Sequence, residues 1–201
     1  MSFNEQNSVE NFIIHRLTGV NLNAIHGGVV REDAPAYGTE PRWKYLEPDL
    51  LVRDISDVML ENEVKAALCK LNPSISSYPE RADEVINKLR AILITVNNVG
   101  LVRANEEFSR WLRNEVTLPF GKNNQHVPVH LIDFDNISNN SFILTNQFKI
   151  RAREIKIPDI VMFVNGIPLV VGEAKTPVRP AVSWFDGAHD INVVYENSVP
   201  Q

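Results

Sequence analysis

Two carboxylates and a lysine stand close together in the segment 158–175. Asp159 opens one apolar run, Glu173 closes the next, and Lys175 follows two positions later. Carboxylate oxygens are ligands that Mg²⁺ prefers, and a neighbouring amine can handle a proton or stabilise developing negative charge. This set of side chains is typical of metal-assisted phosphodiester hydrolysis, in which the cation polarises the phosphate and lowers the pKa of a bound water.

An Asn-Gly pair at 165–166 separates the two apolar runs. Apolar runs around Asn-Gly are a strong hairpin signal, so we expect two antiparallel strands here. Residues two apart on a strand share a face, which places Glu173 and Lys175 on the same side.

The register of this hairpin decides whether the third group joins them. A two-residue loop would set Asp159 opposite Gly172 and turn Glu173 to the other face. We therefore expect an odd-length connection or a bulge between residues 164 and 168, which would bring all three groups to one side.

The roles of the site residues follow from their charge. Asp159 and Glu173 are the expected metal ligands, and the backbone carbonyl of Ala174 is a third candidate oxygen. Lys175 is expected to orient or deprotonate the water, or to stabilise transition-state charge; the alternative is a structural salt bridge at a strand end. Glu10 is a candidate for a further metal ligand, or simply a first-turn carboxylate that stabilises its helix.

The same spacing occurs a second time, earlier in the chain. Pro48-Asp49 is followed by Glu63 and Lys65 at the distances seen in the first set. The second set lies in a helical pattern, where residues two apart point to different sides. We therefore expect an exposed helix face there and not a metal site.

Basic residues gather near the expected site, although the chain has a net charge of −5. They are the DNA-contact candidates Lys149, Arg151, Arg153, Lys156 and Arg179. The first three alternate along an expected strand, where they would neutralise phosphates or form an ordinary solvated face.

Composition narrows the remaining possibilities. The 201 residues contain one cysteine, Cys69, so an intrachain disulfide is excluded and a reducing cytoplasm is expected. No segment approaches the roughly 18 apolar residues of a membrane span, and the N-terminus lacks the pattern of a secretion signal. His126 and His130 lack the partners of a zinc site, and 121–123 fails as a phosphate loop.

The periodicity of apolar residues predicts a sheet domain interrupted by a helical insertion. The expected helices are 8–17 with Ser8 as N-cap, 55–71, 79–96, 105–114 and 181–195, and the expected strands are 127–134, 141–150 and the hairpin; 18–44 is expected to be irregular. In the last helix Trp184 and Phe185 are expected to face inward. We expect one α/β domain over 1–201, with the insertion at about 54–120 and the sheet and metal site at about 127–195.

The chain resembles the N-terminal PD-(D/E)xK nuclease domain of the restriction (R) subunit of type I restriction-modification enzymes. The resemblance covers essentially the whole chain and is carried by the motif at 158–175 and by the landmarks 71–73, 129–134, 139–142 and 146–148. It implies a restriction-endonuclease-like mixed sheet flanked by helices, and Mg²⁺-dependent cleavage of double-stranded DNA, with Mn²⁺ as a possible substitute. Asp159, Glu173 and Lys175 occupy the motif positions.

The resemblance also implies partners and a longer chain. Family members continue into an ATP-driven DNA translocase that these 201 residues do not contain, so the chain is expected to be a fragment of a longer protein. Recognition of DNA sequence would belong to partner methylation and specificity subunits.

One departure concerns the last helix. Many members carry a glutamine four residues before a tyrosine, but here Tyr195, a candidate DNA contact, is preceded by Ile191 at the glutamine position. Two alternatives stay open: a repair or recombination nuclease of the same fold, and a catalytically silent DNA-binding or assembly module.

Overall fold

The chain forms two compact units in its computed structural model. The first unit comprises residues 1–56, 142–163 and 168–199, and the second comprises 57–141, 164–167 and 200–201. The structure describes residues 9–25, 43–151, 154–175 and 183–195, except for the side chains of 24, 25, 97, 194 and 195. The second unit is wider than the expected insertion, since it reaches residue 141 and takes in the turn at 164–167. That the chain folds as one domain stays a prediction.

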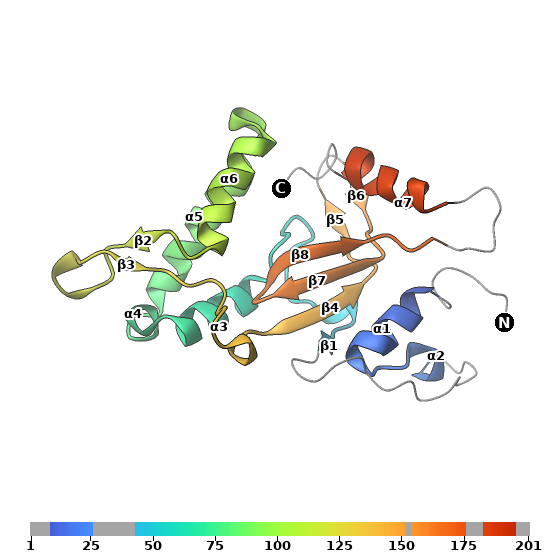
Figure 1. Cartoon of the computed structure of the whole chain (residues 1–201), viewed down its shortest axis with the longest axis horizontal. Coiled ribbons are helices and arrows are strands. Elements are labelled where there is room, and N and C mark those ends of the chain that lie inside the picture. Colours follow the sequence, from blue (N-terminus) through green and yellow to red (C-terminus); the bar gives the residue numbers. More distant parts are fainter. Residues whose placement is uncertain (1–8, 26–42, 152–153, 176–182, 196–201) are drawn as a thin grey trace. The chain divides into compact units, whose positions relative to one another are not determined.

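The first unit is built around a mixed four-stranded sheet, whose strand order is β1-β4-β7-β8 (Figure 1). The strands are β1 (Lys44–Tyr45), β4 (Phe142–Asn146), β7 (Ile160–Val164) and β8 (Ile167–Gly172). β1 runs parallel to β4. Just beyond β4, Gln147 N–H donates to Asp159 O at 3.0 Å and Phe148 N–H to Pro158 O at 3.1 Å, so the segment after β4 runs antiparallel to the segment before β7. The fold is the mixed α/β, restriction-endonuclease-like class expected from the sequence.

Short helices and strands complete the first unit. They are α1 (Asn11–Thr18), α2 (Leu22–Ile25), the 3₁₀ turn η2 (Pro48–Leu50), the antiparallel pair β5 (Ile150–Arg151) and β6 (Ile155–Lys156), α7 (Trp184–His189) and the π-helix η5 (Asp190–Tyr195). Ile14 and Leu22 pack against Leu144 and Ile160, so α1 and α2 contribute to one core with β4 and β7. α7 begins at a capping box in which Ser183 and Asp186 bond each other's backbone N–H groups.

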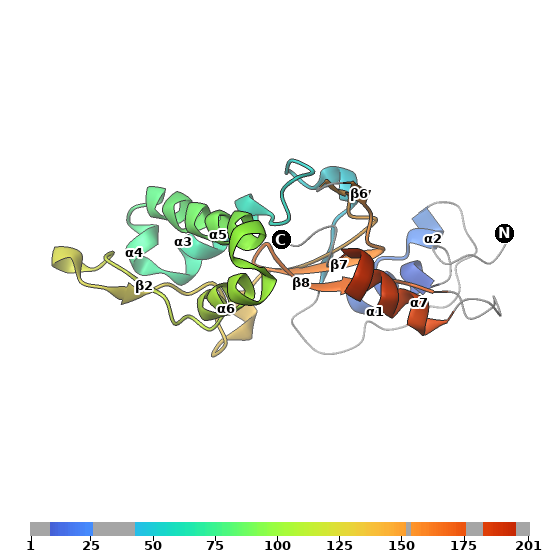
Figure 2. The ribbon, with the colours of Figure 1, turned by 90° about the horizontal axis from the view of Figure 1, so that it is seen from above.

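Helices dominate the second unit. They are α3 (Glu61–Leu71), α4 (Pro73–Ser76), α5 (Glu80–Val99) and α6 (Leu101–Leu112), with the strand pair β2 (Thr117–Leu118) and β3 (Val127–Pro128) and the 3₁₀ turns η3 (Lys122–Asn124) and η4 (Ile137–Asn139). α5 contacts α3, α4 and α6 (Figure 2). Its residues Val85 and Leu89 are completely buried.

The turn between β7 and β8 has two residues, Asn165 and Gly166, with φ values of 52° and 79°. Positive φ at both positions is typical of a type I′ turn, so an odd-length connection was a wrong expectation. The Asn165 amide is 2% exposed and donates to Leu131 O and Asn140 Oδ1, while its Oδ1 accepts from Ser141 N–H. This buried polar network fixes the turn within the second unit.

Three predicted helices differ from the observed ones. The helix expected at 55–71 begins only at Glu61, because Leu60 N–H donates to Gly166 O at 2.8 Å and Arg151 N–H to Ile55 O at 2.8 Å. α6 begins earlier than expected, at Leu101. The first helix begins at Asn11 with Glu10 at the N-cap, and Ser8 lies outside the described residues.

Two residues of the last helix were wrongly predicted to face inward, whereas Ala188 and Ile191, expected on the same face, are half-buried. Trp184 is 70% exposed and Phe185 is 64% exposed, and the two rings stack at 3.8 Å. Gly187 is the buried residue of α7. A glycine gives no hydrophobic signal, so apolar periodicity selects the neighbouring aromatic residues instead.

Two predicted strands are shorter than expected. The strand at 127–134 ends at Pro128, because asparagine side chains bond the backbone that follows: Asn72 bonds His130 and Asn114 bonds Leu131. The strand at 141–150 ends at Asn146, since Gln147 has a φ of 48°, outside the β region. The segment 18–44, expected to be irregular, contains α2 and the first residue of β1.

Candidate metal and catalytic site

Asp159 lies one residue before β7 and is held against the end of β8. Its Oδ2 accepts a hydrogen bond from Ala174 N–H at 2.8 Å. A Cβ on Gly172 would lie 3.5 Å from Cβ of Ile160, so the two arms of the ribbon stay in contact up to the residues that flank the site. An uninterrupted hairpin around a two-residue turn would set Asp159 opposite Gly172. That a bulge brings Asp159 and Glu173 to one side stays a prediction.

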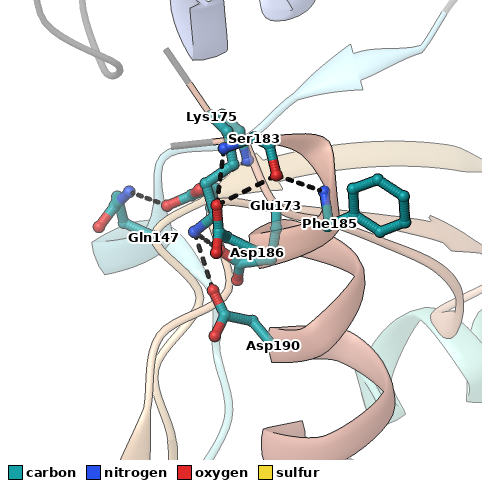
Figure 3. Close-up of polar contacts among 9 residues, drawn as sticks. Gln147, Glu173, Lys175, Ser183, Phe185, Asp186 and Asp190 are labelled. Atoms are coloured by element: carbon teal, nitrogen blue, oxygen red, sulfur yellow. Dashed lines mark hydrogen bonds and ion pairs between the residues drawn. The ribbon is translucent and has the colours of Figure 1, made fainter. Parts of the chain in front are cut away.

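Lys175 forms ion pairs with two carboxylates. Its Nζ lies 3.5 Å from Glu173 Oε2 and 2.9 Å from Asp190 Oδ2 (Figure 3). The side chains of Lys175 and Glu173 are 22% and 7% exposed. The hydrogen bond that Lys175 donates to Asp190 raises the pKa of Lys175, and the charges of Asp190, Glu173 and Asp159 act in the same direction. The amine is thus held as an ammonium beside the two motif carboxylates.

Gln147 connects Asp159 to the first helix. Its Nε2 donates to Glu10 Oε2 at 3.0 Å and to Asp159 Oδ1 at 3.3 Å. Glu10 is 2% exposed. Burial, together with the charges of Glu47 and Glu10, raises the pKa of Tyr45 to about 12. The region near Glu10 is therefore both buried and negatively charged.

Gly187 packs α7 against the site. A Cβ at this position would lie 3.5 Å from Lys175 Cγ and 3.7 Å from Glu173 Cβ, which are ordinary contact distances. α7 therefore lies beside Lys175, and Asp190, the residue that follows α7, pairs with the ammonium.

The donor set suits a hard divalent cation. Among the described residues no three His, Cys, Asp or Glu side chains gather tightly enough to hold a metal. Mg²⁺, however, is usually bound through one or two carboxylates and keeps several waters. Asp159 and Glu173 stay the predicted ligands, and the Ala174 carbonyl and Glu10 stay predicted additions.

The repeated spacing at Asp49, Glu63 and Lys65 forms no comparable group. Glu63 and Lys65 lie on helix α3, as expected. Lys65 Nζ bonds Asp83 of α5 at 2.6 Å with both side chains substantially exposed. Asp49 lies in η2 of the other unit.

The predicted basic ladder is only partly described. Lys149 and Arg151 are exposed, but β5 contains just Ile150 and Arg151, and Lys156 pairs with Glu154 at 3.0 Å. Arg153, Arg179 and the side chain of Tyr195 lie outside the described part of the chain. Their role as DNA contacts stays a prediction.

Sequence reasoning missed several residues that shape the site. Gln147 lies within the landmark 146–148 that the family resemblance marked, and Asp190 stands next to Ile191, but neither residue was predicted to take part in the site. Arg53 was also missed: it lies 3.7 Å over the ring of Phe148 and donates to Lys149 O. A cation stacked on a ring two positions after β4 adds positive charge near Lys149.

Comparisons with known proteins identify the family of the chain. The family model described as the N terminus of the type I restriction enzyme R protein matches residues 35–201. The type I restriction enzyme HindI endonuclease subunit of Haemophilus influenzae is 32% identical over 179 residues, which are 87% of this chain and 15% of that protein. A Methanocaldococcus jannaschii protein, provisionally named the type I restriction enzyme MjaIXP endonuclease subunit, is 29% identical over 180 residues, with the same coverage of 87% and 15%.

No solved structure matches the chain. Within the described residues, none of the helices has the length and apolar character needed to span a bilayer. The chain spans about 15% of the length of the curated relatives named above. From the family match over most of its residues, together with the Asp159, Glu173 and Lys175 cluster, the chain belongs to the family of type I restriction enzyme R protein N termini.

Proposed function

We propose that this chain is a Mg²⁺-dependent endonuclease domain that cleaves double-stranded DNA within a type I restriction complex. The observation that carries the proposal is the bond from Ala174 N–H to Asp159 Oδ2 at 2.8 Å. This bond joins the two arms of the ribbon at Ala174, the residue between Glu173 and Lys175. Family membership and the names of the relatives support the same activity.

Asp159 and Glu173 are the proposed ligands of Mg²⁺, with the Ala174 carbonyl as a third oxygen and Mn²⁺ as a possible substitute. When bound, the cation supplies Lewis-acid polarisation of the phosphate and a more acidic water. Lys175 donates toward both Asp190 and Glu173, which keeps the amine charged. A fixed ammonium suits the stabilisation of negative charge in the transition state better than the uptake of a proton.

The substrate and partners follow from the family and from the surface charge. Lys149 and Arg151 expose positive charge two to four positions after β4, where they would contact phosphates of the duplex. Methylation and specificity subunits are the proposed partners, and ATP would act only through a translocase region outside these 201 residues. Cleavage of DNA in such a complex places the protein in the cytoplasm.

A catalytically silent module is the second candidate. It is favoured by the ion pairs of Lys175 with Glu173 and Asp190, which would also serve as a purely structural clamp at the strand end. Metal binding and cleavage separate the two candidates.

Calorimetric titration of the chain with MgCl₂ and MnCl₂ tests the metal site. Asp159→Ala should abolish binding, because it removes one of two carboxylates. Asp49→Ala is the matched control. Asp49 also follows a proline and begins the repeated spacing, but it lies in η2, where no metal site is proposed. Unchanged binding in Asp159→Ala, or no binding by the wild-type chain, would contradict the proposal.

Lys175→Met then separates an enzyme from a silent module. In the assembled restriction complex the variant should still bind Mn²⁺ but should lose at least roughly 100-fold in the rate of DNA cleavage, as expected for removal of a charge that stabilises the transition state. Wild-type rates in Lys175→Met would favour the silent module.

A further inference from the structure

Gln147 occupies a backbone position that is fixed on both sides. Its φ of 48° is uncommon for a residue other than glycine, and its N–H donates to Asp159 O at 3.0 Å. The next residue, Phe148, is 1% exposed and packs edge-to-face on Phe163 at 5.3 Å. Strained backbone of this kind persists only where the surroundings hold it, and it is common at functional sites.

The side chain of Gln147 links two acidic groups. Its amide nitrogen carries two hydrogens, and it donates to Glu10 Oε2 at 3.0 Å and to Asp159 Oδ1 at 3.3 Å. Glu10 and Gln147 are 137 positions apart in the sequence, so the contact exists only in the folded chain.

The two oxygens of Asp159 are therefore held by different donors. Oδ1 accepts from the Gln147 amide and Oδ2 accepts from Ala174 N–H. Two bonds, one from the residue that follows β4 and one from beyond the end of β8, fix the plane of the carboxylate, while each oxygen keeps a second lone pair. A neutral donor also leaves the charge of Asp159 intact, whereas a lysine or arginine at this place would neutralise it.

Glu10 stands behind this amide. It is buried, and the described residues contain no tight group of three acidic, histidine or cysteine side chains. The Gln147 amide connects Glu10 to Asp159. Outer residues that orient a metal ligand typically change metal affinity by 10–100-fold when they are removed.

We propose that Gln147 is a positioning residue for Asp159, and that Glu10 acts on the metal site by orienting the Gln147 amide and not as a ligand. The inference rests on the proposed function, because it takes Asp159 as a metal ligand. It assigns to Glu10 a different role from the direct ligation expected from the sequence.

The test is the Mn²⁺ affinity of three variants of the 201-residue chain, measured by calorimetry without DNA. Gln147→Asn keeps an amide that tolerates positive φ but withdraws it by one methylene, so the variant should fold and should bind Mn²⁺ about 10–100-fold more weakly. Glu10→Gln keeps an oxygen acceptor and removes the charge, and its affinity should stay within about 3-fold of wild type if Glu10 acts only through the amide. Gln147→Met, of similar length but without the donor, repeats the first result independently.

The outcomes are separable. Wild-type affinity in both Gln147 variants, each shown to be folded by its thermal melt, would overturn the positioning role. A loss in Glu10→Gln as large as in Asp159→Ala would show that Glu10 is a ligand and would overturn its assignment. Absence of Mn²⁺ binding by the wild-type chain would instead overturn the proposed function, on which this inference rests.

Discussion

Lys175 and Asp190 form an ion pair, with Nζ and Oδ2 2.9 Å apart, that fastens the end of the β-ribbon to the π-helical turn η5. The carboxylate that contacts the lysine from this helix belongs to Asp190, the neighbour of Ile191 in the sequence. The lysine of the motif is thus oriented from outside the ribbon as well as by Glu173.

Replacing Asp190 by Asn should change stability in a way that depends on alkaline pH. The pKa of Lys175 is raised above its ordinary value of 10.5, chiefly by the hydrogen bond that its ammonium donates to Asp190. A raised pKa in the folded state stabilises the protein fully below the unfolded pKa, and this contribution disappears as pH rises through the folded pKa. The wild-type advantage over Asp190→Asn should therefore be constant up to about pH 10 and should shrink above it.

Urea unfolding of both proteins between pH 8 and pH 11.5 measures this difference. The raised pKa of Tyr45 also reduces stability at high pH, but both proteins contain this tyrosine, so its effect cancels in the comparison. A difference between the two proteins that is the same at both ends of the range would show that the Lys175 pair does not contribute in this way.

Gly166 should tolerate alanine poorly. Its φ is 79°, and a Cβ would lie 2.5 Å from Leu60 O and 2.8 Å from Val64 N. Backbone atoms cannot move aside as the end of a side chain can, so strain and overpacking add, and Gly166→Ala should lose more than about 3 kcal/mol of unfolding free energy.

Gly19→Ala is the matched control for the steric part of this loss. Gly19 has nearly the same φ, 78°, but a Cβ there would meet nothing within 4 Å. Its cost should be only the left-handed strain of about 1–2 kcal/mol. Equal losses in the two variants, measured by urea unfolding, would mean that the contact with the start of α3 is not rigid.

The sequence could predict those parts of the site whose residues lie close together along the chain. The Asp159, Glu173 and Lys175 group was accessible because the apolar runs and the Asn-Gly turn are local patterns. Gln147 and Glu10 meet across 137 positions, and no local pattern records such a contact.

The same limit explains the errors in the fold. The strand after Val127 stops early because Asn72 and Asn114, remote in the sequence, take over its backbone bonds. The beginning of α3 depends on the Gly166 carbonyl, which comes from the far hairpin. Both features belong to tertiary structure, and helical or strand periodicity cannot predict them.

Gly187 should accept alanine but not leucine. The Cβ of alanine would make ordinary contacts of 3.5 Å with Lys175 and 3.7 Å with Glu173, and alanine favours a helix more than glycine does. Leucine would push α7 away and separate Asp190 from Lys175. Gly187→Ala should thus match or exceed the wild-type melting temperature, whereas Gly187→Leu should melt lower.

The alkaline stability profile identifies the cause of that loss. Gly187→Leu should resemble Asp190→Asn, with a difference from wild type that shrinks above about pH 10 because the same ion pair is broken. A destabilised Gly187→Leu protein that keeps the full wild-type dependence on pH would show that the Lys175 to Asp190 contact survives, contrary to the geometry.

The convergence of Asp159 and Glu173 on one cation is tested most directly by a crystal structure of the chain soaked in MnCl₂, with data recorded where manganese scatters anomalously. An anomalous peak is predicted roughly 2.0–2.3 Å from one carboxylate oxygen of each residue. A peak bound elsewhere, or no peak in crystals that contain both side chains in ordered density, would contradict the account.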